Sequence, residues 1–218
     1  MIRQSHTVFK LTLIALLSLG LMACQSAYYS AMESVGQHKR DILSSRIEGV
    51  RDAQVDAKEQ FRDALDRFSQ ELGYSGGELQ SVYENLRDAY EDSKKEADNV
   101  TARIDKVEDV AEALFAEWED ELEQYSSASL RRDSQTKLRQ TRSQYKRMLT
   151  TMRSAESKMA PVLTTFNDQV LYLKHNLNAR AISSLKAEFG DLRRDINTLI
   201  ARMEDSIAES EKFVESLK

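Results

Sequence analysis

Residues that break helices or cross-link chains are scarce in this sequence. Its 218 residues include one cysteine, one proline and seven glycines. A single cysteine excludes an intramolecular disulfide, so the fold depends on side-chain packing. Few prolines and glycines, combined with a 31% share of charged residues, favour long helices. We therefore expect an all-α protein.

An excess of basic charge is also missing. The formal net charge is −5, and removal of the leader described below, which carries Arg3 and Lys10, leaves 29 basic against 36 acidic residues, a net charge of −7. General binding to nucleic acid requires a basic footprint. Nucleic acid is therefore not an expected partner.

The beginning of the chain has the pattern of a secretory leader. Two basic residues in the first ten precede an apolar run of about 12 residues, 11–22. A helix of that length rises ~18 Å and cannot cross a hydrocarbon core of ~30 Å. The segment is typical of a cleaved targeting peptide rather than of a membrane span.

The only cysteine, Cys24, follows this run directly. Leu21, Met22 and Ala23 precede it, which resembles the signal-peptidase recognition site of bacterial lipoproteins. The pattern predicts a signal peptide over residues 1–23 and acylation of Cys24. An ordinary signal peptide with a coincidental cysteine is the alternative.

The lipoprotein pattern also predicts a location in the cell envelope. The acyl chains on Cys24 would hold the protein on the periplasmic face of a membrane. Under the lipoprotein sorting rule, aspartate after the cysteine retains a protein in the inner membrane. Gln25 stands there instead, which favours the outer membrane.

Three short breaks divide the remaining chain into four segments. They lie at residues 73–77, 125–127 and 176–178. Within the segments, apolar residues alternate steps of three and four, an average period near 3.5 that is typical of left-handed supercoiled helices. Short connections make consecutive helices antiparallel neighbours. We expect an elongated antiparallel four-helix bundle, or coiled coil, over residues 41–218, and residues 24–40 as the acylated cysteine and tether.

Local signals refine this picture. Ser127 or Ser129 can cap the third helix, and Asn178 suits a left-handed helix end. Pro161 falls inside the third helix, where it should cause a kink. The core-facing positions of the first helix are weakest near Gln54. Because such patterns also fit pairing between chains, a homo-oligomer built from two-helix hairpins stays open.

Four stretches of the sequence resemble one protein family. They are residues 38–43, 107–125, 129–132 and 170–182. The family is a domain-of-unknown-function family of proteobacterial helical lipoproteins, and the resemblance covers nearly the whole chain after the leader. Members are sometimes labelled DNA-repair ATPases. No G-x-x-x-x-G-K-[ST] phosphate loop occurs here, so that label has no support in the sequence.

Residue patterns of known enzymes are not found. His38 and His175 lie on different predicted helices, and no Glu-x-x-His pair of a di-metal bundle is present. Three Ser-x-x-Lys spacings occur without the Ser-Asp-Asn and Lys-Thr-Gly partners of serine enzymes. We expect no catalytic residues, no metal site, no cofactor and no enzymatic activity.

Charge is strongly segregated around the second break. Residues 105–123 carry nine acidic residues and one lysine, whereas residues 131–147 carry seven basic residues and one aspartate. Opposite charges on antiparallel neighbours would fix their pairing and register. Alternatively, some arginines face outward and bind anionic lipid, cell-wall polymer or a partner. These candidate residues are Arg131, Arg132, Arg139, Arg142 and Arg147.

Aromatic residues gather near the same break. Phe115, Trp118 and Tyr125 are expected to pack at the end of the bundle, and a tip that binds a partner is the alternative. Helix-length arithmetic places the break at Ser126 at the end of the bundle nearer the membrane.

The sequence as a whole predicts a lipid-anchored, non-enzymatic periplasmic scaffold or adaptor. It would be held at a membrane by its acyl chains and would present a helical surface to an envelope protein. The alternative is a binding module for anionic membrane or cell-wall polymer that acts through the basic third helix.

Overall fold

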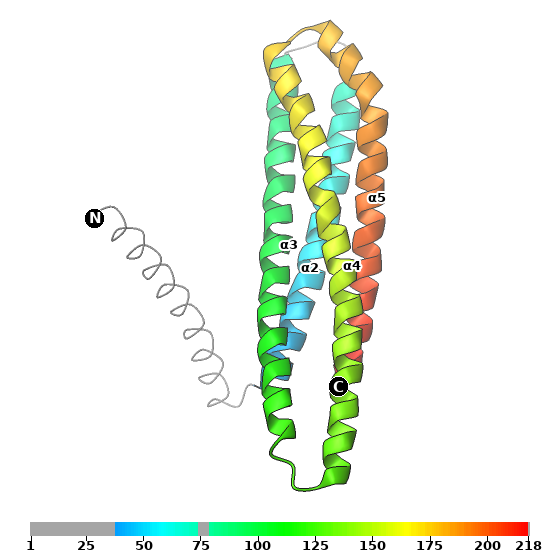
Figure 1. Ribbon diagram of the computed structural model, residues 1–218. Coiled ribbons are helices and arrows are strands. Elements are labelled where there is room, and N and C mark those ends of the chain that lie inside the picture. The colour runs from blue at the N-terminus through cyan, green and yellow to red at the C-terminus, as the bar shows by residue number, and fades with distance from the viewer. Residues whose placement is uncertain (1–37, 74–78, 218) are drawn as a thin grey trace, which may run out of the picture.

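The protein is an elongated bundle of helices (Figure 1). The computed structural model describes residues 38–73 and 79–217, and these residues contain no strand. The helices are α2 (Lys39–Leu72), α3 (Leu79–Leu122), α4 (Ala128–His175) and α5 (Ala179–Leu217). At 1.5 Å per residue, the 48 residues of α4 span about 72 Å. The predicted all-α antiparallel bundle is confirmed, and α2 begins two residues before the expected domain boundary.

Each helix packs against two others in a closed ring. α2 contacts α3 and α5, and α4 also contacts α3 and α5, so that α2 and α4 lie diagonally opposite. Because each helix runs opposite to the one before it, every side of this ring pairs antiparallel helices. A single apolar core extends along the ring's axis and includes residues from all four helices.

The buried positions follow the three-and-four spacing of the sequence. On α3, Val100, Ile104 and Val107 are fully buried. An aromatic cluster fills the core farther along, where the Phe68 ring lies 5.8 Å from that of Phe166 and 5.3 Å from that of Phe189. Large aromatic rings bury much apolar area and favour such edge-on and offset arrangements.

The two ends of the bundle differ. One end holds the start of α2, the turn between α3 and α4, and the end of α5 (Figure 1). We call it the hairpin end, because the α3–α4 hairpin extends beyond the other two helices there. At the far end lie the connection from α2 to α3 and the turn between α4 and α5. The Ser126 turn lies at the same end as the start of α2, and its predicted position near a membrane stays a prediction.

The helix ends confirm one capping prediction and correct another. The Ser127 hydroxyl accepts a hydrogen bond from the Leu130 amide at 3.4 Å, so Ser127 is the cap of α4. Asn178 does not occupy a left-handed helix end. Its side-chain oxygen accepts from the Ala181 amide at 3.1 Å and caps the first turn of α5, a role for which asparagine is among the best residues.

Pro161 lies within α4 without ending it. The helix is continuous from Ala128 to His175, and Pro161 is exposed on its surface. The Thr165 hydroxyl donates to the Pro161 carbonyl at 3.2 Å, which is a local side-chain partner for that backbone oxygen. The kink itself stays a prediction.

Two buried polar residues interrupt the apolar core. Gln54 of α2 and Ser206 of α5 are both fully buried. The amide atoms of Gln54 and the hydroxyl of Ser206 have no hydrogen-bond partner among the described residues. Since a buried polar group without a partner costs free energy, the weak position predicted near Gln54 is also weak in the folded bundle.

Candidate interaction surfaces

The acidic side of α3 meets part of the basic run of α4. Arg131 donates to Glu123 with an Nη2–Oε1 distance of 2.6 Å, and Arg142 donates to Glu119 with an Nη1–Oε1 distance of 2.6 Å. The hydrogen bond from Arg142, and then its charge, lower the pKa of the Glu119 carboxyl. The predicted charge pairing between these helices is therefore confirmed for two of the five candidate arginines.

Arg142 also contacts the aromatic core. Its guanidinium lies 5.0 Å from the centre of the Phe115 ring, a cation–π arrangement. Phe115 in turn meets Tyr145 edge to face at 5.4 Å. Burial raises the pKa of the Tyr145 hydroxyl. Arg142 therefore connects the ion pair on the surface to Phe115 and Tyr145 in the core beneath it.

A further arginine, outside the predicted run, makes the densest ion-pair cluster. Arg153 donates to Asp105 at 2.7 Å, to Glu156 at 2.8 Å and also to Glu108. Partial burial lowers the pKa of Arg153, but the hydrogen bonds that its guanidinium donates to three carboxylates outweigh this effect and raise the pKa overall. The basic run in the sequence ends at Arg147, because the five residues that follow, 148–152, are uncharged. Helical spacing was the available signal, since Arg131, Arg142 and Arg153 follow one another at steps of eleven residues, about three helical turns.

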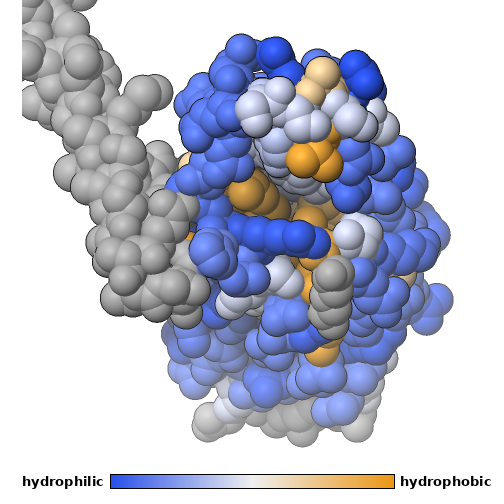
Figure 2. All heavy atoms as spheres, turned by 90° about the horizontal axis from the view of Figure 1, so that it is seen from below, coloured by the Kyte–Doolittle hydropathy of each residue, from blue (hydrophilic) through white to orange (hydrophobic). Residues whose placement is uncertain are grey.

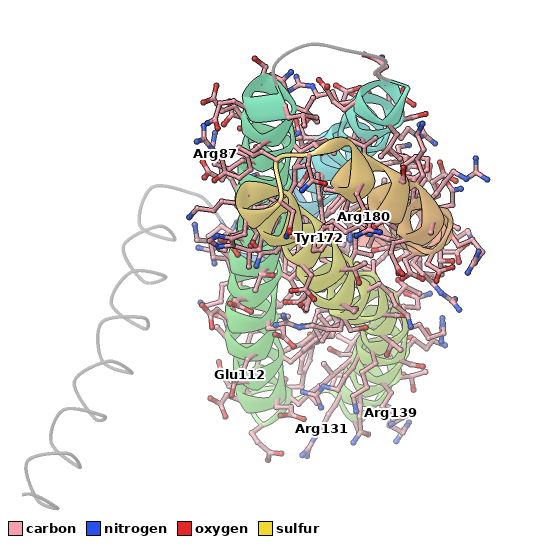
Figure 3. All side chains as sticks on the ribbon, turned by 90° about the horizontal axis from the view of Figure 1, so that it is seen from above. Arg87, Glu112, Arg131, Arg139, Tyr172 and Arg180 are labelled. Atoms are coloured by element: carbon pink, nitrogen blue, oxygen red, sulfur yellow. The ribbon has the colours of Figure 1, made fainter. Side chains whose placement is uncertain are left out.

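The remaining candidates make no ion pair with the described residues of α3. In Figure 3, Arg131 lies between the lower parts of α3 and α4, and Arg139 lies on the other side of α4. Arg139 donates to the Thr136 hydroxyl at 3.0 Å, and Arg147 donates to the Ser143 hydroxyl at 3.1 Å. In the first half of α4, up to residue 150, four exposed cations have no carboxylate partner among the described residues, and we call them the basic ridge: Arg132, Arg139, Lys146 and Arg147.

The basic ridge has a regular geometry. Its members Arg132, Arg139 and Lys146 are separated by seven residues each, so they lie along one line of the helix. A hydroxyl-bearing residue follows each of them four positions later: Thr136, Ser143 and Thr150. The Thr136 and Thr150 hydroxyls donate to the backbone carbonyls of Arg132 and Lys146, so it is the exposed cations that are suited to an anionic surface. Lys146 was absent from the sequence-based candidates.

Large apolar side chains are exposed only at the two ends of the described bundle. Tyr125 and Leu130 flank the turn at the hairpin end, and Leu130 is 59% exposed. Leu171, Tyr172 and Leu177 are exposed at the far end. Because single exposed apolar residues are ordinary, it is their clustering at the ends that makes these places candidate contact sites.

The three aromatic residues near the turn have different surroundings. Phe115 is buried, as predicted, whereas Tyr125 is exposed. Trp118 is partly buried, and its indole Nε1 donates to the Ser134 hydroxyl at 2.8 Å. The hydrogen bond fixes the indole between α3 and α4, with part of the ring left uncovered.

Other expected features fall into two groups. Cys24, Leu21, Met22 and Ala23 lie outside the described residues. Across residues 38–73 and 79–217, no three His, Cys, Asp or Glu side chains come together where they could bind a metal ion. None of the described helices has a stretch long and apolar enough to cross a membrane.

Comparison with known proteins returned one finding. The sequence model of a family described as a protein of unknown function, DUF2959, matches residues 28–217. Neither the curated proteins nor the solved structures contain a match to the chain.

Proposed function

Because the chain belongs to the DUF2959 family of proteins of unknown function, we propose a role from its own residues. The protein is a lipid-anchored, non-enzymatic scaffold or adaptor on the periplasmic face of a bacterial envelope membrane, by preference the outer membrane. Acylated Cys24 is its anchor, and the far end of the bundle contacts an envelope protein.

The polarity of the bundle is the observation that carries this proposal. The chain enters the described bundle at the hairpin end, where α2 begins at Lys39 (Figure 1). The opposite end, about 70 Å away by helix length, exposes Leu171, Tyr172 and Leu177. A protein tethered at one end and apolar at the other is suited to holding a partner at a distance from the membrane.

Crosslinking in living cells tests the proposal. A photo-reactive amino acid at Leu171 or Leu177 should give discrete adducts with one or a few envelope proteins, identified by mass spectrometry. The same group at Lys158, an exposed position midway along α4, is the matched control. The adducts should disappear in the Cys24→Ala variant. Equal labelling from all three positions, or labelling that survives loss of Cys24, would contradict the scaffold role.

A second candidate function has its own support in the basic ridge. Exposed cations without acidic partners begin at Arg132, close to the hairpin end, in a chain that is otherwise acidic. Tyr125 and Leu130 are exposed beside them. Basic and apolar side chains together are characteristic of surfaces that rest on anionic lipid headgroups. Under this candidate function, the protein binds an anionic membrane through α4.

Sedimentation with vesicles separates the second candidate from the first. The triple variant Arg132→Gln, Arg139→Gln, Arg147→Gln should lose salt-sensitive binding to phosphatidylglycerol vesicles. The matched control, Arg67→Gln, Arg193→Gln, Arg202→Gln, removes the same charge from α2 and α5 and should keep it. Equal loss in both variants would indicate a general charge effect. Binding to cell-wall sacculi instead of vesicles would identify a polymer as the ligand.

A further inference from the structure

The side of the bundle formed by α3 and α4 is divided by charge. Along α3, every seventh residue from 84 to 119 is an exposed acid, and we call this line the acidic stripe: Glu84, Glu91, Asp98, Asp105, Glu112 and Glu119. Along α4, the basic ridge follows the same seven-residue step from Arg132 to Lys146, and Arg153 continues it. A line of one charge at this step is typical of a helix that pairs with a second helix of opposite charge.

Contacts within the chain satisfy only part of these charges. Two acids of the stripe, Asp105 and Glu119, are bound by arginines of α4. Glu112 and the nearby Asp109 are exposed and form no ion pair with the described residues. The same holds for the basic ridge. Unpaired charges of both signs therefore lie on one side of the bundle, each sign on its own helix.

The surface of α4 is hollowed between its cations. A depression of about 440 Å³ is lined by Arg139, Arg142, Ser143, Lys146, Arg147 and Thr150. Small side chains lie beside the acidic stripe on α3, where Ala102 and Ala116 are exposed. A helix that carries carboxylates can therefore approach α4 closely, and each carboxylate that enters the depression would meet several cations.

The sides of the bundle offer little apolar area for a contact. Figure 2 shows mostly hydrophilic atoms around the sides that are visible from the hairpin end, and apolar atoms near the centre of that end. A partner on the side of α3 and α4 must therefore be recognised by charge. It has to present acids to α4 and bases to α3, and a second copy of this chain has that pattern.

We propose that two copies of the chain pair through their α3–α4 sides, with α4 of each copy lying against α3 of the other. Two kinds of two-fold axis can bring these sides together. An axis across the helices would place α3 against α3 and α4 against α4, so that like charges meet. An axis parallel to the helices places the basic ridge of each copy on the acidic stripe of the other, and electrostatic complementarity selects it.

The register of this pairing follows from a contact within the chain. The ion pair between Arg153 and Asp105 shows how α4 is aligned with α3. Because the helices are antiparallel, Lys146 and Glu112, each seven residues nearer the hairpin end, stand level with each other. An axis parallel to the helices preserves this height. Lys146 of one copy therefore meets Glu112 of the other, and the pair occurs twice in the dimer.

The contact is large enough for a specific dimer. From Arg132 to Arg153, α4 spans ~32 Å, and two helices side by side are ~20 Å wide. Such a side covers ~640 Å² on each copy, or ~1,300 Å² in total, in the lower part of the range for specific interfaces. Since the contact consists mainly of exposed charges, added salt should weaken it.

The pairing goes beyond the proposed scaffold function, and the charges that select it do not depend on the anchor. The axis places both hairpin ends together, so two chains acylated at Cys24 would enter the same membrane. The two apolar far ends would also lie beside each other and offer a partner two contact sites. Because each basic ridge would be covered by the other copy, this dimer favours the scaffold over binding of lipid through α4.

Crosslinking of the full chain in living cells tests the pairing. A photo-reactive amino acid at Ser143 should give a covalent dimer, with twice the mass of the chain, in which the second chain is attached through a peptide that contains Ala116. Lys212 is the matched control, because it is exposed on α5 at a similar height, as the Ser216–Gln144 hydrogen bond of 3.1 Å shows. No dimer from Ser143, equal dimer from both positions, or attachment through the peptide that contains Ser143 itself would overturn the proposal.

An exchange of charges tests the complementarity. The variant Arg139→Glu, Lys146→Glu carries acids on both helices, and the variant Asp109→Lys, Glu112→Lys carries bases on both. Each variant alone should lose the dimer from Ser143, and the two produced together should recover it as a heterodimer. Homodimers that persist in either variant, or the lack of a heterodimer, would overturn the proposal.

Two features keep these outcomes separate from other effects. The Ser143 crosslink needs only one exposed substitution, so it does not depend on the stability of the charge variants. Adducts from Leu171 with envelope proteins, measured in the same cells, report on the scaffold function. Loss of the dimer with these adducts retained would overturn the pairing alone, whereas loss of the adducts with the dimer retained would contradict the scaffold function alone.

Discussion

Nη1 of Arg142 lies 2.6 Å from Oε1 of Glu119, and this ion pair joins α4 to α3 directly above the ring of Phe115. It connects two consecutive helices, of which α3 carries the acidic run and α4 the basic run, with one turn between them. Contacts of this kind add little stability when exposed, but they disfavour shifted registers that would bring like charges together.

The coupling between Arg142 and Glu119 should depend on pH. The folded state lowers the pKa of Glu119, so the pair stabilises the fold above the ordinary titration range of glutamate. Its contribution is lost as the pH falls through the lowered pKa. A double-mutant cycle with Glu119→Gln and Arg142→Gln, measured by chemical denaturation, should show coupling at neutral pH and none at about pH 2. Coupling that is unchanged by acid would show that the charge of Glu119 is not involved.

Arg153 should be the most important surface arginine for stability. Arg153→Ala removes a guanidinium that binds Asp105, Glu108 and Glu156 and leaves three neighbouring carboxylates unpaired. Because its side chain is 32% exposed, we expect a loss of about 1–2 kcal/mol in the free energy of unfolding. Arg147→Ala, on the basic ridge, should change it by less than ~0.5 kcal/mol. Equal losses in urea titrations of the two variants would contradict this assignment.

Replacement of Gln54 should stabilise the bundle. Gln54→Leu removes a fully buried amide that has no partner among the described residues and keeps most of the side-chain volume. The free energy of unfolding should rise by about 1 kcal/mol or more. A fall on thermal or urea unfolding would indicate that the amide binds ordered water. Ser206→Ala removes the other fully buried polar group without a partner among the described residues and should act in the same direction.

Pro161→Ala should also stabilise α4. Proline inside a helix removes one backbone hydrogen bond and crowds the preceding turn, at a cost of up to ~3 kcal/mol. Since Pro161 is exposed, alanine would leave no cavity, and a gain of about 1–3 kcal/mol is expected. Circular dichroism melts of the variant, with Ala160→Ser as a neighbouring control, provide the measurement. A lower melting temperature would mean that the bundle packing requires the bend.

Most of the fold could be predicted from the sequence because few features interrupt its helical pattern. The steps of three and four at Val100, Ile104 and Val107 determine which face is buried, and the scarcity of glycine and proline leaves few points at which a helix would be interrupted. Asn178 was misassigned because asparagine suits both a helix end and a helix start, and two residues separate α4 from it.

The interaction surfaces could be predicted only in part. The runs of opposite charge predicted that α3 and α4 would pair. A run of charges does not indicate, however, which of its side chains face the neighbouring helix. Arg131 and Arg142 face α3, whereas Arg139 faces outward, and this depends on the rotation of α4 about its own axis. To predict the ion pairs of Arg153, one would also need the register of α4 against Asp105 and Glu108 of α3.

The proposed function depends on acylation of Cys24, and intact-mass analysis of the chain recovered from bacterial cells tests this modification. We expect a chain that begins at Cys24, carries a diacylglycerol on its thiol and sediments with membranes. The Cys24→Ala variant should remain helical but lose both the lipid mass and the membrane association. A wild-type chain with an unmodified Cys24, recovered without membrane, would contradict the claim.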